Sequence, residues 1–142
     1  MDEQKYPIAT VGALVFNPEG KVILLKSDKW KGKYVVPGGH IELGETILDA
    51  LRREIKEETN LDVRDIKFVC HQEFIYDEAF AKPRHYVFLD YACRTDSEDV
   101  RLNEEAQSYE WVTLEEALTL PIDPYTRKLI ETYQHYRGTD SV

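Results

Sequence analysis

The sequence predicts an α/β protein in which helices cover both faces of a mixed β-sheet, that is, an α/β/α sandwich. Short runs of apolar and β-branched residues recur along the chain, as expected of strands, and segments with helical periodicity interrupt them. Helices that interrupt a series of strands bury their apolar faces against the sheet. A length of 142 residues suits one domain, so we expect residues 1–142 to fold as a single unit.

The chain begins with a predicted β-hairpin. Residues 8–16 (IATVGALVF) are apolar and rich in β-branched side chains, and residues 21–26 (KVILLK) form a second run of the same kind. Between them, the sequence Asn17-Pro-Glu-Gly20 is typical of a tight turn. Two strands joined by so short a turn are expected to pair with each other.

A polar loop, residues 27–32, and a short strand, residues 34–37, lead into a Gly-Gly turn. Trp30 in this loop could stack on a base or sugar, although a loop tryptophan more often packs over its own loop. Lys33 and its neighbouring lysines could meet phosphates, or they could simply be solvated. His40 directly follows the Gly-Gly turn, where we expect it to line a site. These three side chains are therefore our candidates for substrate binding.

A helix is predicted to begin near Thr46 and to end near Asn60. Its apolar residues follow the i, i+4, i+8 spacing of a buried face, and they are Ile47, Leu48, Leu51 and Ile55. This stripe should fix the helix against a core. Because the stripe overlaps the edge of the acidic face of the same helix, we expect acidic side chains at the border of the core, held rigidly and only partly solvated.

Three carboxylates crowd that acidic face. At ~100° per helical residue, Glu54, Glu57 and Glu58 fall within about a 100° sector. Like charges at i,i+3 and i,i+4 each cost roughly 0.2–0.5 kcal/mol, and Arg53 alone cannot neutralise all three carboxylates. A bound divalent cation could do so, and carboxylate oxygens suit Mg²⁺ or Mn²⁺. The cluster therefore favours a metal site over a purely structural acidic helix.

Two long strands are predicted after this helix, at residues 65–76 and 85–93, both rich in aromatic and β-branched side chains. The connection between them, residues 77–84, contains charged residues and Phe80. It is either a substrate-facing loop or a tight surface hairpin. A last short strand is predicted at residues 109–112.

Two further helical segments follow. The first, at residues 113–118, begins with the Thr-x-x-Glu pattern of a capping box. The second runs from about residue 124 to residue 136. Residues at helical spacing in this second segment are interpreted as its core face, and they are Tyr125, Leu129, Ile130 and Tyr133.

Composition restricts the class of partner. The formal net charge of −9 argues against a nucleic-acid polymer, because phosphate backbones are normally met by an excess of Lys and Arg. A small anionic substrate stays compatible with this charge if metal ions screen the carboxylates. No apolar run approaches the ~20 residues of a membrane helix, and the first residues, MDEQKYP, differ from a secretory signal, so we expect a cytoplasmic protein with no membrane partner. The two cysteines, Cys70 and Cys93, are expected to be buried free thiols.

The stretch GGHIELGETILDALRREIKEETNL, residues 38–61, resembles the signature of the Nudix (MutT-like) hydrolases. The matching positions in the box, residues 39–61, are Gly39, Glu45, Arg53, Glu54, Ile55, Glu57, Glu58 and Leu61. Asn60 stands where the family has a glycine. Asparagine tolerates the left-handed conformation better than other non-glycine residues, so the loop should keep its shape. The resemblance implies the Nudix type of α/β/α sandwich.

The resemblance also implies roles for the acidic residues. Glu57 and Glu58 resemble the main magnesium ligands of the family, and the Gly38 carbonyl and Glu105 would complete the metal site. Glu105 is preferred because its distance in sequence from the Glu-Trp dipeptide at residues 110–111 matches the family better. Glu104 is the neighbouring alternative. Either residue could also be an ordinary solvated acid in a loop.

The catalytic group implied by the resemblance is Glu54, Arg53 and Glu57. Glu54 resembles a metal ligand or general base, and Arg53 the arginine that orients it through a salt bridge. Glu45 resembles the box acid of secondary importance.

A metal-dependent hydrolysis follows from these roles. The expected reaction cleaves a nucleoside diphosphate linked to another moiety X, with Mg²⁺ as cofactor and Mn²⁺ as a substitute. A nucleoside triphosphate or a nucleotide sugar is the leading substrate, and a homodimer would be unsurprising since dimers are common among relatives. The alternative is a Nudix-fold module that binds a nucleotide without cleaving it. Such modules usually lose box acids, whereas this chain keeps them.

Overall fold

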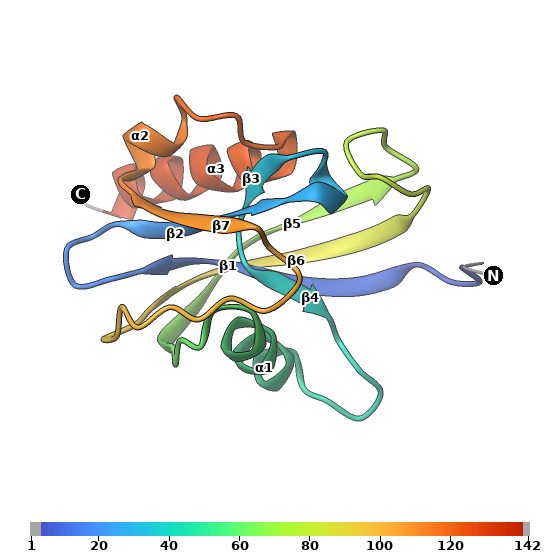
Figure 1. Cartoon of the computed structure of the whole chain (residues 1–142), viewed down its shortest axis with the longest axis horizontal. Helices are drawn as coiled ribbons and strands as arrows, with labels where there is room; N and C mark the ends of the chain where they lie inside the picture. The colour runs from blue at the N-terminus through green and yellow to red at the C-terminus, as the bar shows by residue number, and fades with distance from the viewer. Residues whose placement is uncertain (1–3, 141–142) are drawn as a thin grey trace.

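The protein, described by a computed structural model over residues 4–140 and with side chains as far as Tyr136, is a mixed β-sheet between two helical layers (Figure 1). The strands are β1 (Ile8–Phe16), β2 (Val22–Ser27), β3 (Lys33–Val35), β4 (Gly38–His40), β5 (Arg64–Ile75), β6 (His85–Arg94) and β7 (Ser108–Val112). The helices are the short 3₁₀ helix η1 (Asp28–Trp30) and the α-helices α1 (Ile47–Thr59), α2 (Leu114–Ala117) and α3 (Pro124–Asp140).

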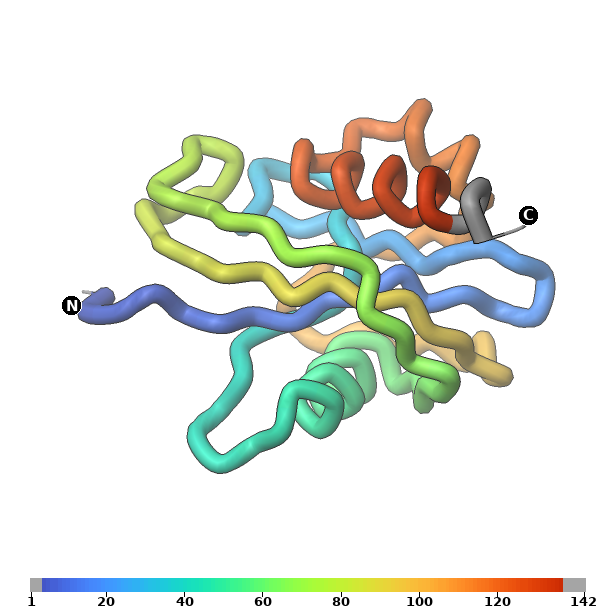
Figure 2. The backbone as a smooth tube through the Cα atoms, turned by 180° about the vertical axis from the view of Figure 1, so that it is seen from behind, coloured from blue at the N-terminus to red at the C-terminus, as the bar shows by residue number. Residues whose placement is uncertain are grey.

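The strand order in the sheet is β3-β2-β1-β6-β5, with β4 paired to β1 and β7 paired to β2. The central pair, β1 and β6, is parallel, whereas the other pairs are antiparallel, so the sheet is mixed. Helix α1 lies on one face of the sheet, and α2 and α3 lie on the other, as the two opposite views show (Figures 1 and 2). The predicted α/β/α sandwich is therefore confirmed. Within residues 4–140, no helix has the length and apolar character needed to cross a membrane.

The predicted N-terminal hairpin is confirmed at its turn but does not extend along the whole of β1. Phe16 pairs with Val22, and the side-chain oxygen of Asn17 accepts a hydrogen bond of 2.9 Å from the Lys21 backbone N–H, which closes the turn. Beyond the turn the strands separate, because β4 pairs with β1 in register Gly12↔Gly38. A Cβ on Gly38 would stand 2.0 Å from the Val11 carbonyl oxygen, so only glycine fits this close approach.

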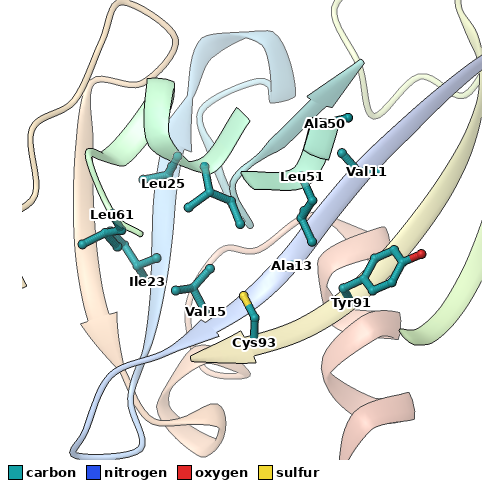
Figure 3. Packing of buried hydrophobic residues seen from close by; sticks show 11 residues of the cluster. Val11, Ala13, Val15, Ile23, Leu25, Ala50, Leu51, Leu61, Tyr91 and Cys93 are labelled. Carbon is teal, nitrogen blue, oxygen red and sulfur yellow. The ribbon is translucent and has the colours of Figure 1, made fainter. Parts of the chain in front are cut away.

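Two apolar layers hold the sandwich together. The layer between the sheet and α1 is shown in Figure 3, and its buried members are Val11, Ala13, Val15, Ile23, Leu25, Ala50, Leu51, Ile55, Leu61, Tyr91 and Cys93. The layer on the α3 side includes Leu14, Val22, Leu24, Leu129 and Ile130. Burying one such aliphatic side chain contributes roughly 1.5–3 kcal/mol, so both helical layers are firmly attached to the sheet. The two cysteines are free, with Cys93 buried and Cys70 half-buried.

The predicted apolar stripe of α1 is wrong at its first turn. Leu51 and Ile55 are fully buried, but Ile47 and Leu48 are 39% and 38% exposed. Their angular positions on the helix are suitable for burial, since they lie one turn before Leu51. We infer that the first turn of α1 projects past the part of the core that would cover it. The helix is therefore held by its middle and its end, where the acidic residues also lie.

Both ends of α1 are formed as the sequence predicts. The Thr46 hydroxyl accepts a hydrogen bond of 3.1 Å from the Asp49 backbone N–H, which is an N-cap. At the other end Asn60 adopts the left-handed conformation with φ 70°, and its N–H donates to the Lys56 carbonyl. The prediction that asparagine replaces the family's glycine without altering the loop is thus confirmed.

The later helices differ from the prediction only in detail. The capping box of α2 is present, formed by Thr113 and Glu116. Helix α3 extends to Asp140, about one turn beyond the expected end. The predicted core face of α3 is confirmed at Leu129 and Ile130, which are buried, and at Tyr133, which is partly buried and packs against the same layer. Tyr125 is half-buried and lines a pocket instead.

Candidate active site

A pocket of about 470 Å³ is bordered by residues from both helical layers. One side of it, which we call the acidic side, is formed by Glu54, Glu58 and Glu105 with the backbone of Gly38 and Gly39. The other side, which we call the aromatic side, includes Trp30, Phe80, Tyr86, Phe88 and Tyr125. One cavity thus joins a set of carboxylates to a set of rings.

Arg53 organises the acidic side from outside the pocket wall. Its guanidinium makes two bonds to the Glu45 carboxylate, of 2.6 and 2.8 Å. It also bonds Glu54 at 2.9 Å, Glu57 at 3.0 Å and the His40 carbonyl oxygen at 3.0 Å. A guanidinium has five N–H donors in a rigid fork, so one arginine fixes three carboxylates and one carbonyl. The hydrogen bonds from Arg53 lower the pKa of Glu45 to about 2.

Glu58 is the most buried of these carboxylates. It accepts a hydrogen bond of 2.7 Å from the Gly38 backbone N–H, a neutral donor. Burial raises the pKa of Glu58 to about 8, and the charges of Glu54 and Glu105 contribute to this rise. A carboxylate so placed is stabilised in its charged form by a nearby cation.

Glu54 lies directly against Gly39, which belongs to strand β4 and not to the Gly-Gly turn that the sequence predicted. A Cβ on Gly39 would stand 2.2 Å from the Glu54 Oε2, so the lack of a side chain at position 39 makes room for this carboxylate. The Glu54 side chain is 19% exposed, against 48% for Glu57. Burial raises the pKa of Glu54, while the hydrogen bond from Arg53 opposes that rise. Glu54 therefore faces the cavity, and Glu57 faces Arg53 and solvent.

The acid before β7 that borders the pocket is Glu105 rather than Glu104. Glu105 is part of the pocket wall, and its carboxylate pairs with the Lys29 ammonium at 2.5 Å. Glu104 is exposed and does not belong to the wall. Of the two alternatives left open by the sequence, the structure brings Glu105 beside Glu54 and Glu58.

The donor set on the acidic side fits a hard divalent cation. Among residues 4–136, whose side chains the structure describes, no three His, Cys, Asp or Glu side chains already stand together as a metal-binding group. The carboxylates are held instead by nitrogen atoms, with Glu57 on Arg53, Glu58 on Gly38 and Glu105 on Lys29. The side-chain atoms that could bind a metal are nevertheless all carboxylate oxygens, the preferred ligands of Mg²⁺ and Mn²⁺. The buried negative charge at Glu58 is one that such a cation would balance.

The three candidate substrate-binding residues are placed differently. Trp30 is half-buried and lines the aromatic side. His40 also lines the pocket, with its ring centre 5.6 Å from that of Tyr86. Lys33 is exposed on β3 and does not form part of the pocket wall.

Most of the aromatic side was not anticipated as part of a site. The Trp30 ring centre lies 4.9 Å from that of Phe80 and 5.5 Å from that of Phe74, both edge-on, which is a favourable arrangement. Tyr86 and Phe88 are stacked at 5.7 Å. The signal in the sequence was the two-residue spacing of aromatic side chains in β6, which places them on one face of the sheet.

The connection between β5 and β6 borders the pocket, as one of the two interpretations of the sequence required. Phe80, Ala81, Lys82 and Arg84 all belong to the pocket wall. The segment is held at both sides, because the Ala81 N–H donates to the Lys29 carbonyl at 2.8 Å and the Tyr125 hydroxyl donates to the Asp77 carboxylate at 2.7 Å.

The chain is similar to proteins of one family along most of its length. The sequence model of the NUDIX domain matches residues 7–133. The nucleoside triphosphatase NudI of Enterobacter sp. (strain 638) is 32% identical over 128 residues, which cover 83% of this chain and 91% of that protein. NudI of Escherichia coli (strain K12 / DH10B) is 32% identical over 105 residues, covering 70% and 74%.

Solved structures agree with this likeness. A MutT NUDIX hydrolase from Burkholderia pseudomallei superposes with a TM-score of 0.77 at 26% identity, covering 90% of this chain and 98% of the other. The MutT protein from Methanosarcina mazei Go1 gives a TM-score of 0.77 at 24% identity, covering 95% and 99%, and supports the fold alone.

Proposed function

The chain belongs to the NUDIX domain family and is a Nudix hydrolase, and from that premise we propose that it is a Mg²⁺-dependent pyrophosphohydrolase that converts a nucleoside triphosphate to a nucleoside monophosphate. More generally the substrate is a nucleoside diphosphate linked to a moiety X, and a nucleotide sugar is the next choice. The triphosphate is preferred because the similar bacterial proteins are named nucleoside triphosphatases. Mn²⁺ is the expected substitute for Mg²⁺.

The observation that carries this proposal is the union of Glu54, Glu58 and Glu105 in one pocket with a wall of aromatic rings. The carboxylates suit the metal ions that accompany a polyphosphate, and the rings suit a nucleoside. The net charge of −9 would otherwise repel a polyphosphate, so metal ions are needed on the acidic side.

The residues that would hold Mg²⁺ are Glu54, Glu57, Glu58 and Glu105, with the Gly38 carbonyl. When bound, the ion screens the phosphate charge and acidifies water. Hydrolysis forms a bond from a water oxygen to phosphorus and breaks the bond from that phosphorus to the bridging oxygen, which leaves with the rest of the phosphate chain.

Protein side chains orient this step. Glu54 accepts the proton of the attacking water, and Arg53 keeps the Glu54 carboxylate in place through their 2.9 Å bond. Replacing Glu54 with Gln should lower kcat far more than it raises KM, since the amide keeps its size but cannot accept the proton. An unchanged kcat would assign the base elsewhere.

A hydrolysis screen tests the function itself. Purified protein with Mg²⁺ is offered nucleoside triphosphates, nucleotide sugars, ADP-ribose and dinucleoside polyphosphates, and the products are separated by chromatography. We expect turnover of a nucleoside triphosphate that is lost in Glu57→Gln and kept in Glu104→Gln, a matched change at an exposed acid outside the pocket wall. Tight binding without turnover throughout the panel would instead support the non-catalytic nucleotide-binding module.

A further inference from the structure

A second carboxylate group lies in the same pocket, away from the acidic side. Asp90 is on β6, on the face of the sheet that α3 covers, and it is only 6% exposed although it belongs to the pocket wall. The proposed hydrolysis leaves it without a role. Burying a charged side chain at the centre of a sheet is unfavourable unless the charge is paired, so its presence requires a reason.

Gln72 positions Asp90. The Gln72 side-chain nitrogen donates to the Asp90 Oδ2 at 2.9 Å and to the Tyr125 carbonyl oxygen at 2.9 Å. Both neighbours are acceptors, so the orientation of the amide is fixed by chemistry. The Gln72 Oε1 is thereby turned away from both of them and is left as an acceptor.

The second oxygen of Asp90 opens onto the cavity. Among the side chains that the structure describes, those of residues 4–136, no donor bonds the Asp90 Oδ1. This atom is not sealed from water, because Asn17 Nδ2 is the one buried side-chain atom without a partner among them. The same holds for the Gln72 Oε1. Asp123, the other buried acid of the wall, accepts hydrogen bonds from Tyr125 and Thr126 at the start of α3.

A glycine leaves space beside this carboxylate. Gly12 is the residue of β1 paired with Asp90, and it also lines the pocket. A Cβ on Gly12 would stand 3.8 Å from the Asp90 Oδ1, and 3.4 Å from a methyl group of Val36, which are ordinary contact distances. The rings of Phe88 and Tyr125, 5.4 Å apart, border the same part of the wall.

We propose that Asp90, positioned by Gln72, binds the edge of the substrate's nucleobase and selects bases that carry an exocyclic amino group. The Asp90 Oδ1 and the Gln72 Oε1 are acceptors facing a cavity with aromatic walls. An amino group donates to such acceptors, whereas an oxo group in its place presents a lone pair to them. Guanine, cytosine and adenine can therefore donate from an amino group, whereas uracil and hypoxanthine offer only a ring N–H beside an oxo oxygen and should bind more weakly. This inference rests on the proposed function and adds the base to it.

Matched substrate pairs test the inference. GTP and ITP differ by one amino group, and CTP and UTP exchange amino for oxo on one ring. The assay is run well above pH 7, where the Asp90 carboxylate is ionised and only accepts hydrogen bonds. For the unaltered protein we then expect kcat/KM to be about tenfold higher for GTP than for ITP, and likewise for CTP over UTP, the effect of roughly one hydrogen bond. In Asp90→Asn both ratios should fall toward one, while Glu73→Gln, an exposed acid outside the pocket wall, should keep them.

A second variant keeps the test decisive if Asp90→Asn folds poorly. Gly12→Ala adds one methyl group beside the Asp90 Oδ1 without a steric clash in the sheet, so it should raise KM for GTP severalfold while the melting temperature stays unchanged. A preference of the unaltered protein for ITP over GTP, or for UTP over CTP, overturns the inference. It is also overturned if Asp90→Asn keeps the substrate ratios of the unaltered protein and Gly12→Ala leaves KM unchanged. Absence of any hydrolysis by the unaltered protein would overturn the proposed function instead.

Discussion

The two sides of the pocket are built in different ways. The acidic side comes almost entirely from one continuous stretch, Gly38 to Glu58, in which the short strand β4 faces helix α1. The aromatic side comes from η1, β6, α3 and the β5–β6 connection, which are far apart in the sequence. The proposed chemistry thus depends on residues that are close together in the sequence. The space for the rest of the substrate is lined by residues that are distant in the sequence and meet only in the folded protein.

The two sides also differ in the groups that stabilise their buried carboxylates. On the acidic side Arg53 bonds three carboxylates and leaves Glu58 to a neutral backbone N–H. On the other side Asp90 accepts hydrogen bonds from the Gln72 amide and the Cys70 thiol, and it takes part in no ion pair among the described side chains. The first arrangement suits a site that receives a cation, and the second suits one that receives a hydrogen-bond donor.

Replacing Glu58 with Gln should lower activity about as severely as Glu57→Gln, and it is the largest effect in the comparison of the two sides. The amide keeps the side-chain volume but removes the charge that a cation would balance, so we expect kcat/KM to fall roughly a thousandfold. Added Mg²⁺ should also stop raising the melting temperature, because a ligand that no longer binds the folded state cannot stabilise it. Calorimetric melting with and without Mg²⁺, beside Glu104→Gln as control, measures this. A Glu58→Gln protein that Mg²⁺ still stabilises would remove Glu58 from the metal site.

The contrast between the two sides explains why the sequence predicts the residues of the acidic side but not the role of Asp90. The spacing of Glu54, Glu57 and Glu58 on one helix predicts their shared sector, because helical geometry converts sequence spacing directly into position. The cavity role of Asp90 depends on which strand lies beside β6 and on the absence of a side chain at Gly12, and no local pattern contains either fact. Ile47 and Leu48 show the same limit, since their exposure depends on how far the core extends under α1.

The buried carboxylate of Asp90 should make stability depend on pH. Burial raises its pKa to about 7 from the ordinary 3.8, and the charge of Asp123 adds to the effect. Between these values the folded state holds a proton that the unfolded state has lost, so the free energy of unfolding should fall as pH rises from about 4 to about 7, and then level off. The loss is on the order of 2–4 kcal/mol.

Comparing the unaltered protein with Asp90→Asn isolates this contribution, because Glu58 titrates in the same direction and is present in both proteins. Denaturant unfolding at a series of pH values supplies the free energies. The difference between the two proteins should change by this amount across the interval and be constant above it. A difference that is independent of pH would show that the carboxylate of Asp90 is ionised throughout.

Exchanging Arg53 for Lys should have a smaller effect on the acidic side. Lysine keeps the positive charge but cannot make two parallel bonds to Glu45 while also bonding Glu54 and Glu57. We expect kcat to fall about tenfold, with KM nearly unchanged, since the carboxylates stay in the pocket but lose their fixed orientation. Steady-state kinetics on the preferred substrate checks this. A loss as large as that of Glu58→Gln would mean that Arg53 itself contacts the substrate.

The smallest effect is expected at Asn60, where the chain departs from the family signature at the end of the acidic helix. Glycine would relieve the left-handed conformation, which costs a non-glycine residue on the order of 1 kcal/mol. It would also remove the 3.0 Å hydrogen bond from the Asn60 side chain to the Asp99 carbonyl and increase the freedom of the unfolded chain. These contributions nearly cancel, so Asn60→Gly should change the free energy of unfolding by less than about 0.5 kcal/mol and leave kcat unaltered. Asn60→Val, which cannot adopt this conformation without strain, should cost at least about 1 kcal/mol in the same denaturation experiment. If glycine and valine destabilised the protein equally, the side-chain bond to Asp99, and not the backbone conformation, would be what holds the end of α1.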